Sequence, residues 1–223
     1  MLTWPELWPP FGVVITEHDL RLTVVTDADV PGLVDLALGG IHDPDTMPFA
    51  MPWTLAEPSA LPADMIRYFS GVRAGFRPDK FDLLFAVRID EALVGVQALH
   101  ATDFAVVRSG ETGSWLGRRH QGRGIGTRMR RALCAFVFDD LGAVEVTSGA
   151  FLDNPASLAV SRKVGYRPNG QFRMTRRQDE VAMNQRLVLT PDTFIRGELI
   201  EVQGAAALRE FLALDQAGDH GTP

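Results

Sequence analysis

Apolar residues recur along the chain with two periods. Short apolar or alternating segments bounded by turn residues predict β-strands, and segments with apolar residues three and four apart predict helices. Strands are expected at residues 11–16, 20–26, 83–89, 93–102, 111–116, 144–151, 166–177 and 181–190. Helices are expected at residues 29–38, 60–75 and 125–141, and between Asn154 and Gly165. This order of elements predicts an α/β protein.

The two ends of the chain show weaker patterns. Residues 1–10 are rich in Trp and Pro, and we expect them to be irregular. Residues 191–214 read as a terminal appendage with a strand at 198–202 and a helix at 205–214, and residues 216–223 are expected to be loose. At 223 residues the chain can bury a substantial core. We expect a single domain over 1–223, with its core at about 20–190 and the C-terminal appendage at 191–223.

The helix predicted at 125–141 is amphipathic. Its apolar stripe comprises Ile125, Met129, Leu133, Phe136 and Val137, whereas Arg128, Arg130, Arg131 and Asp139 lie off the stripe. This pattern is typical of a helix that packs on a sheet through one face. Cys134, the only cysteine, falls on the apolar side, which favours a core residue over a nucleophile and excludes an intramolecular disulfide.

A glycine-rich segment, Gln121-Gly122-Arg123-Gly124-Ile125-Gly126, lies directly before this helix. Glycines permit a tight turn that brings backbone N–H groups close to a ligand, and the positive end of the helix dipole points to the same place. Residues 118–131 hold six arginines and no carboxylate, although the chain has a formal net charge of −6. The segment therefore predicts a phosphate site; the alternative is a plain turn before a surface helix.

The spacing of the glycines narrows the ligand. A Walker loop requires a lysine after the glycines, and none is present. A dinucleotide-binding turn requires GxGxxG, which the spacing Gly122-x-Gly124-x-Gly126 fits poorly. The pattern Gln-x-x-Gly-x-Gly instead resembles the loop with which the Gcn5-related N-acetyltransferases (GNAT superfamily) hold the pyrophosphate of coenzyme A. A nucleotide-binding protein of another fold remains an alternative.

Further motifs resemble one branch of this superfamily. Asn154-x-x-Ser157, followed by Gly165-Tyr166, is similar to the helix after the fifth strand in the RimJ/RimL-type branch, which acetylates the N-termini of ribosomal proteins. Residues 111–116 resemble the Glu-x-Gly-Tyr-Trp strand of that branch, with Ser114 in place of the tyrosine. The run around 42–53 is similar to an actinobacterial subgroup that includes a mycobacterial succinyltransferase.

The resemblance implies a fold, a reaction and a cofactor site. The expected fold is the α/β GNAT fold, a central mixed, mostly antiparallel sheet with splayed parallel strands in its middle and helices on its flanks. The expected reaction is direct attack of a primary amine on the thioester of acetyl-CoA or succinyl-CoA, so the protein would be an acyltransferase of the transferase class. The residues expected to bind the cofactor are Leu116, Gly117, Arg118, Gln121, Gly122, Arg123, Gly124, Ile125, Gly126, Thr127, Asn154 and Ser157.

The resemblance also points to catalytic residues. A backbone N–H near Ser114 is expected to stabilise the oxyanion. Many family members carry a tyrosine seven residues after the asparagine as the acid that protonates the thiolate, and this chain has Ser161 there, a poor acid. Glu111 is the expected base, with Asp43 and His42 as rivals. Because the tyrosine is missing, one alternative is a GNAT-fold module that binds acyl-CoA as a sensor and does not catalyse a reaction.

The segment 41–53 contains three prolines and large apolar residues beside His42 and Asp43. It predicts either a loop that covers the core or a substrate-facing wall to which His42, Asp43 and Met47 contribute. His42 and the loop around it are also candidates for contacting the carboxylate of a succinyl group.

Composition limits the other partners. The acidic pI, near 5.4, gives no reason to expect nucleic-acid binding. No stretch reaches 18 apolar residues and the N-terminus does not read as a signal peptide, so we expect a cytoplasmic protein without a membrane span. A cysteine-rich metal site is excluded and no metal is expected. The acceptor, a protein N-terminus, a lysine or a small amine, stays open, as does a homo-oligomer.

Overall fold

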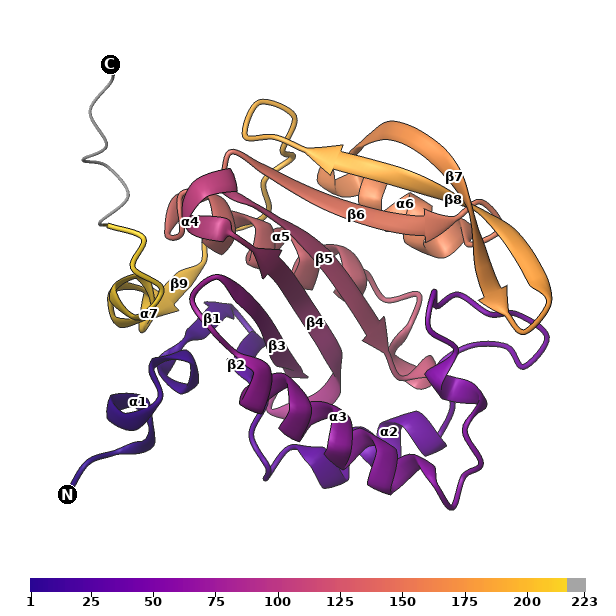
Figure 1. Ribbon diagram of the computed structural model, residues 1–223, viewed down its shortest axis with the longest axis horizontal. Helices are drawn as coiled ribbons and strands as arrows, with labels where there is room; N and C mark the ends of the chain where they lie inside the picture. The colour runs from indigo at the N-terminus through magenta and orange to yellow at the C-terminus, as the bar shows by residue number, and fades with distance from the viewer. Residues whose placement is uncertain (216–223) are drawn as a thin grey trace.

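The fold is built on one nine-stranded sheet. The computed structural model describes residues 1–215, and the sheet has the strand order β7-β8-β6-β5-β4-β3-β2-β1-β9 (Figure 1). The strands are β1 (Val14–Glu17), β2 (Leu20–Val24), β3 (Lys80–Ile89), β4 (Ala92–Thr102), β5 (Ser109–Leu116), β6 (Glu145–Phe151), β7 (Arg167–Arg177), β8 (Glu180–Leu189) and β9 (Glu201–Gln203). Neighbouring strands are antiparallel except β5 and β6, which are parallel.

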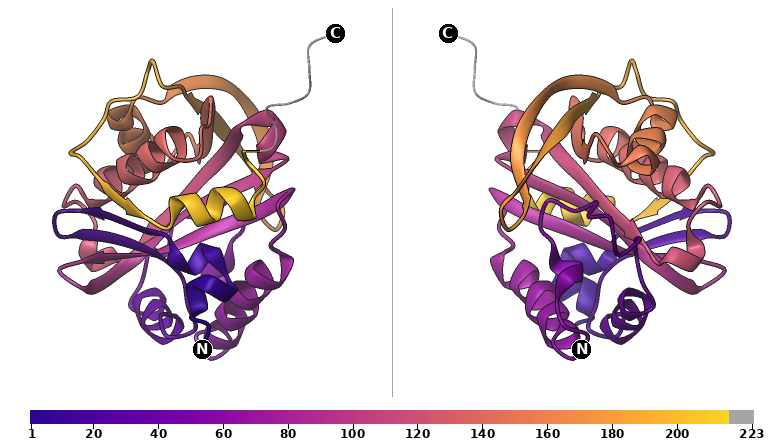
Figure 2. Two further views of the ribbon diagram at one scale, coloured as in Figure 1. Left: turned by 90° about the vertical axis from the view of Figure 1, so that its left-hand side faces the viewer. Right: turned by 90° about the vertical axis from the view of Figure 1, so that its right-hand side faces the viewer.

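Helices cover both faces of this sheet (Figure 2). The α-helices are α1 (Trp4–Leu7), α2 (Val30–Leu38), α3 (Leu61–Gly75), α4 (Phe104–Val107), α5 (Ile125–Asp139), α6 (Pro155–Val164) and α7 (Ala205–Phe211). Short 3-10 helices lie at η1 (Pro9–Gly12), η2 (Trp53–Leu55) and η3 (Arg118–His120). Helix α5 packs with Leu133 and Phe136 in the larger core, whereas α2 and α3 form a second core with Leu84 and Val96 on the other face.

The two parallel strands separate after a short paired stretch. Ser109–Thr112 of β5 pair with Glu145–Ser148 of β6, and beyond these positions the strands diverge toward their carboxyl ends (Figure 1). The N–H of Gly117 donates to Val94 O of the neighbouring β4. Because an antiparallel ladder alternates, the N–H groups of Ser114 and Leu116 point to the side from which β6 has withdrawn. We call this splayed part of the sheet, between residues 114–116 of β5 and the carboxyl end of β6, the wedge.

Side chains of β5 alternate between the two helical layers. Leu116 packs in the core of α5, and Trp115 packs in the core of α2 and α3. Thr112 and Ser114 therefore face α5, whereas Glu111 and Gly113 face the opposite layer. This alternation decides which catalytic candidates can meet each other.

Local signals explain the differences from the predicted elements. The N-terminus is not irregular, since the Thr3 N–H donates to Glu6 Oε2 at 2.6 Å in a capping box that starts α1. Pro9 and Pro10 then favour η1, so the first strand starts at Val14 rather than at residue 11. Helix α4 was not predicted; it lies between two left-handed residues, Asp103 and Arg108.

The C-terminal appendage is an integral part of the fold. Strand β9 is shorter than predicted, yet it pairs with β1, joining Val14 to Gln203, and completes one edge of the sheet. Leu208 and Leu212 are fully buried in the larger core. The residues expected to be loose, 216–223, lie outside the described part of the chain. Over residues 1–215, no helix combines the length and apolar character needed to cross a membrane.

Candidate functional site

The glycine-rich segment forms a turn with free backbone donors. Gly122 and Gly124 have positive φ values of 73° and 80°, which glycine adopts at little cost, and Gly124 is the N-cap of α5. The N–H of Thr127 donates back to Gly124 O at 3.0 Å. Among residues 1–215, no acceptor is bonded to the N–H groups of Gly122–Gly126. These donors, at the positive end of a 15-residue helix, form an anion site.

The six arginines of residues 118–131 serve different purposes. Arg118, Arg119 and Arg123 are exposed around the turn. Arg128 instead pairs with Glu17 at 2.8 Å and with Asp19 at 2.6 Å, two carboxylates more than 100 residues away in the sequence. Only part of the positive charge read from the sequence is therefore available to a ligand.

His120 lies within the remaining positive charge. Its Nε2 accepts a hydrogen bond from Arg119 Nε at 2.9 Å, so the ring is neutral in this arrangement. Burial and the nearby charges of Arg119 and Arg123 lower the pKa of His120. A bound phosphate would oppose the effect of both arginines.

The side chain of Gln121 ties the turn to its surroundings. Its Nε2 donates to Ile41 O at 2.6 Å and to Leu116 O at 2.9 Å. The N–H of Arg118 donates to Gly40 O at 2.9 Å, and its side chain approaches Asp43 at 3.8 Å. Gly117 packs closely on Leu36 of α2. The end of β5, the turn and the loop after α2 therefore form one connected unit.

Helix α6 forms the other wall of the wedge. Its start and end follow the predicted signals: Asn154 Oδ1 accepts from Ser157 N at 3.1 Å, Pro155 occupies the first turn, and Gly165 ends the helix in the left-handed region. A β-carbon added to Gly126 would lie 3.5 Å from Val160 Cγ2, so α5 and α6 pack closely there. Asn154 and Ser157 consequently lie at the end of α6 near the wedge between β5 and β6.

Arg130 occupies the inner end of this wedge. The prediction that it lies on the polar side of α5 is wrong, because the residue is only 4% exposed. Its guanidinium donates to Ser114 Oγ at 2.8 Å, Ser148 Oγ at 3.3 Å and Ser161 Oγ at 3.5 Å. Two of the predicted catalytic residues, Ser114 and Ser161, thus meet through a buried cation that sequence reasoning missed. The sequence signal for its burial was the apolar set Leu133, Cys134 and Val137, which follow Arg130 at helical spacing.

Two other titratable groups lie beside Arg130. Tyr166 O–H pairs with Thr112 Oγ1 at 2.8 Å and contacts Cys134 Sγ at 3.6 Å. Burial raises the pKa of the Cys134 thiol to about 11 and raises that of Tyr166 well above its ordinary value. Cys134 is therefore a core residue, and the buried Tyr166 cannot take the place of the missing acid tyrosine.

The opposite face of the sheet carries a histidine–aspartate pair, with His100 on β4 and Asp82 on β3. His100 Nδ1 donates to Asp82 Oδ1 at 2.8 Å, which leaves Nε2 as an acceptor. Nε2 lies 3.6 Å from the position that a β-carbon on Gly113 would take. Glu111, the predicted base, is paired in register with His100 on the same face. His100 was not predicted, because a cross-strand neighbour 18 positions away in the sequence leaves no local pattern.

The loop at 41–53 lies against the carboxyl end of β5. The rings of Phe49, Trp53 and Trp115 form a chain with centroid separations of 5.5 and 5.7 Å. His42 is held by Asp43 O at 2.8 Å and Thr54 Oγ1 at 2.7 Å.

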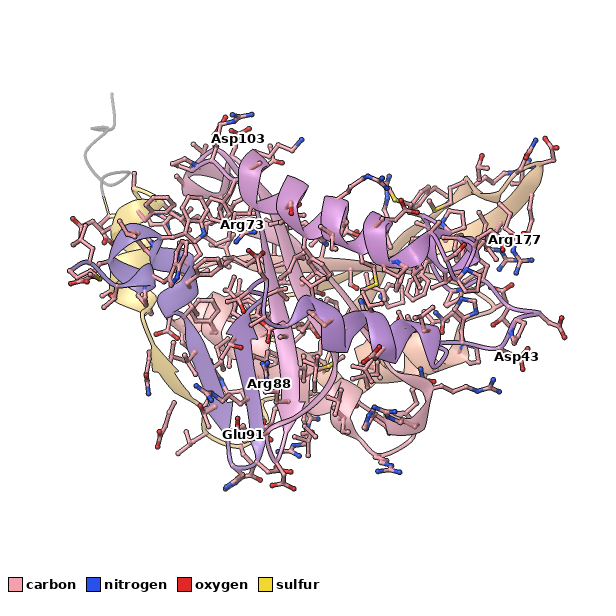
Figure 3. The ribbon with its side chains drawn as sticks, turned by 90° about the horizontal axis from the view of Figure 1, so that it is seen from below. Asp43, Arg73, Arg88, Glu91, Asp103 and Arg177 are labelled. Carbon is pink, nitrogen blue, oxygen red and sulfur yellow. The ribbon has the colours of Figure 1, made fainter. Side chains whose placement is uncertain are left out.

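The residues predicted on this loop therefore have different surroundings. Met47 is 2% exposed, so its side chain belongs to the loop's own core. Asp43 is exposed, and Figures 1 and 3 place its loop at the same end of the molecule as Arg177 and the β7–β8 hairpin.

Comparisons with known proteins agree with this architecture. A family profile described as "Acetyltransferase (GNAT) domain" matches residues 19–167. The chain is 33% identical over 84 residues to the "Putative ribosomal N-acetyltransferase YdaF" of Bacillus subtilis; this alignment spans 38% of the chain and 45% of that relative.

Solved structures resemble the chain over more of its length. Mycobacterium smegmatis RimJ in complex with CoA-disulfide has a TM-score of 0.71 at 19% identity, over 91% of this chain and 95% of that one. RimL, a ribosomal L7/L12 alpha-N-protein acetyltransferase in complex with coenzyme A, has a TM-score of 0.62 at 18% identity, over 81% of this chain and 99% of that one. The mixed sheet with its one parallel pair is the GNAT fold, and the chain belongs to the GNAT acetyltransferase family.

Proposed function

We propose that this protein transfers an acyl group from acyl-CoA to a primary amine by direct attack within a ternary complex. The observation that supports this most is the position of the free N–H groups of Gly122–Gly126 at the start of α5, next to the wedge between β5 and β6. With the pyrophosphate bound at the turn, the rest of the cofactor would lie in the wedge.

The cofactor would follow the open side of β5. The turn N–H groups, with Arg118, Arg119 and Arg123, would hold the pyrophosphate. The N–H groups of Ser114 and Leu116 point into the wedge and can bind the pantetheine amides or the thioester oxygen. Gln121 would act indirectly, since its amide already donates to two carbonyl groups.

The acceptor amine must be neutral to attack the thioester. A lysine amine has a pKa of about 10.4 and an α-amine one of about 7.8, so an α-amine needs less help from a base. We assign His100 as the base, with Asp82 holding its tautomer and Glu111 beside it. In this scheme the C–N bond forms, the C–S bond breaks, and the amine proton passes to His100 Nε2.

The names of the relatives suggest the acceptor class. The proteins similar to this chain include acetyltransferases of ribosomal proteins. We therefore infer a protein N-terminus as the acceptor, with lysines and small amines as the alternatives. The donor is acetyl-CoA or succinyl-CoA.

Thermal unfolding with acetyl-CoA, succinyl-CoA and free CoA, combined with an assay for CoA release, tests the proposal. A ligand that binds only the folded state stabilises it by about 2.7 kcal/mol at 100 times its Kd. We expect stabilisation by all three ligands and amine-dependent CoA release with one donor. Stabilisation without release from any amine would favour the acyl-CoA sensor, and no stabilisation at all would refute the CoA site.

A further inference from the structure

The guanidinium of Arg130 is a buried charge without a partner of opposite sign. Among residues 1–215 its recorded contacts are the hydroxyls of Ser114, Ser148 and Ser161, with no carboxylate, and its Nε has no acceptor. Burial of an isolated cation is costly, and buried charges are normally paired. The fold bears this cost beside the wedge between β5 and β6, which points to an anion that arrives there.

One of the three serines can offer a hydrogen to a ligand. Ser148 Oγ donates to Thr112 O at 3.0 Å, so its proton is already used. Ser161 Oγ accepts from Arg130, but the residue is 0% exposed and has no surface for a ligand to contact. Ser114 Oγ accepts from Arg130 at 2.8 Å, is half-buried, and within the described residues donates to no acceptor. A hydroxyl that accepts from a cation becomes a stronger donor through polarisation, so Ser114 offers a charge-assisted donor in front of a buried positive charge.

This donor lies on the β5 side of the wedge. Ser114 belongs to β5, whose free N–H groups face the wedge, and α6 on the other side carries Asn154 and Ser157 at its N-terminal end. A thioester that binds along β5 has its carbonyl and sulfur next to Ser114. Negative charge develops first on the carbonyl oxygen and then on sulfur, so the cation lies behind both atoms.

We propose that Arg130, acting through Ser114, stabilises the sulfur of coenzyme A as a thiolate, so that the leaving group departs without a proton. This inference rests on the proposed acyl transfer. When the C–S bond breaks, its electron pair stays on sulfur and the thiolate accepts a hydrogen bond from the Ser114 hydroxyl. Ser114 keeps its proton, and the amine proton goes to His100. A buried cation thereby replaces the acid tyrosine of other family members.

A bound thiol reports this environment directly, because a thiolate absorbs in the ultraviolet and a thiol does not. We would titrate free CoA bound to the protein, using CoA in the same buffer as the reference. A neighbouring arginine lowers a thiol pKa. We expect at least about tenfold more thiolate in the bound form at a given pH, which is one pKa unit.

The variants separate charge from structure. Arg130→Lys keeps the charge and should retain most of the shift, whereas Arg130→Met and Ser114→Ala should reduce it while CoA still stabilises the fold. The other titratable groups facing the site are Cys134 and Tyr166 on the α5 side and His100, Asp82 and Glu111 across β5. Cys134→Ser is the spectroscopic control, because it removes the protein's own thiol, and it should leave the titration unchanged.

The wild-type titration alone can overturn the proposal, even if a variant fails to fold. Bound CoA that titrates like free CoA would refute it while leaving the acyltransferase intact. A second result would also refute it: Arg130→Met loses activity with succinyl-CoA but not with acetyl-CoA, and the titration of the bound CoA thiol is unchanged. Arg130 would then be assigned to binding the succinyl carboxylate. Failure of CoA to bind would instead refute the proposed function.

Discussion

At the scale of single residues, the site separates acid–base chemistry from charge stabilisation across the two faces of β5. His100 and Asp82 lie on the face of α2 and α3, and Arg130 lies on the face of α5. Each strand residue can serve only one of these faces. The amine and the leaving group would accordingly be handled by different sets of side chains.

His100 can be tested against Glu111, the base predicted from sequence. General-base catalysis contributes about 10²–10⁴-fold, so His100→Asn should lower kcat by at least about 10² with little change in CoA affinity. Glu111→Gln should cost less, because the glutamate only adjoins the imidazole. Steady-state kinetics with one donor and a saturating amine measures both. A larger loss in Glu111→Gln would return the role to the carboxylate.

His120 should make cofactor binding depend on pH. Burial and the two arginines lower its pKa in the free protein, so the folded chain binds fewer protons than the unfolded one and loses stability as pH falls below about 6.5. A bound pyrophosphate opposes this shift. Dephospho-CoA should therefore bind more tightly as pH falls through that range, and calorimetry should detect proton uptake. If dephospho-CoA affinity depended on pH as steeply in His120→Asn as in the unchanged protein, the assignment of this effect to His120 would be contradicted.

Gly165 is constrained by both its backbone and its neighbours. Its φ is 106°, and a β-carbon there would overlap the carbonyl oxygen of Thr193. Gly170 has a similar φ of 89° but nothing within 4 Å of such a carbon. Backbone strain costs about 1–3 kcal/mol. Urea unfolding should show that Gly165→Ala lowers the free energy of unfolding more than Gly170→Ala does. Equal losses would mean that the backbone around Thr193 shifts to accommodate the added carbon.

At the scale of secondary-structure elements, the sequence predicted every α-helix and strand that surrounds the site, but not the short 3-10 helix η3. Strong local signals explain this success, such as the Asn154 cap and the glycines before α5. The failures involve partners far away in the chain. No local sequence pattern predicts that Arg128 pairs with Glu17, that Arg130 contacts buried serines, or that His100 pairs with Asp82. Periodicity places a residue on a face but does not identify what packs against it.

The two roles of Asn154 can be separated at this scale. Its Oδ1 caps α6, and its Nδ2 makes no recorded hydrogen bond among the described residues. Asn154→Ala should lower stability by about 1 kcal/mol through loss of the cap. Asn154→Asp keeps an acceptor for the cap but removes the amide donor, so it should retain stability and bind CoA several-fold more weakly. Unchanged CoA affinity in the aspartate variant would restrict Asn154 to capping.

At the scale of the whole molecule, the N-terminal segment lies beside β9 and α7. Strand β9 pairs with β1, and Trp8 contacts Phe211 at a centroid separation of 5.3 Å (Figures 1 and 2). The C-terminal segment therefore closes an edge of the sheet and covers part of the core. The sequence identified both elements there but not their contact with the N-terminus.

Removal of residues 200–223 should expose the edge of β1 and the surface beneath Leu208 and Leu212. An uncovered strand edge favours association with other chains. We expect a lower Tm and larger species in size-exclusion chromatography. A chain that ends at residue 215 is the control, since it keeps β9 and α7. Unchanged Tm in the shorter chain would mean that this edge is dispensable.

The same pairing sets an order of events during synthesis. The ribosome makes β1 long before β9, and Val14 must wait for Gln203 to emerge. The nascent chain can assemble the central strands and the cofactor turn while β1 still lacks its outer neighbour. Since such long-range pairing is slow, this edge of the sheet is completed after its centre. During translation the N-terminal strand is thus the part most in need of chaperone protection.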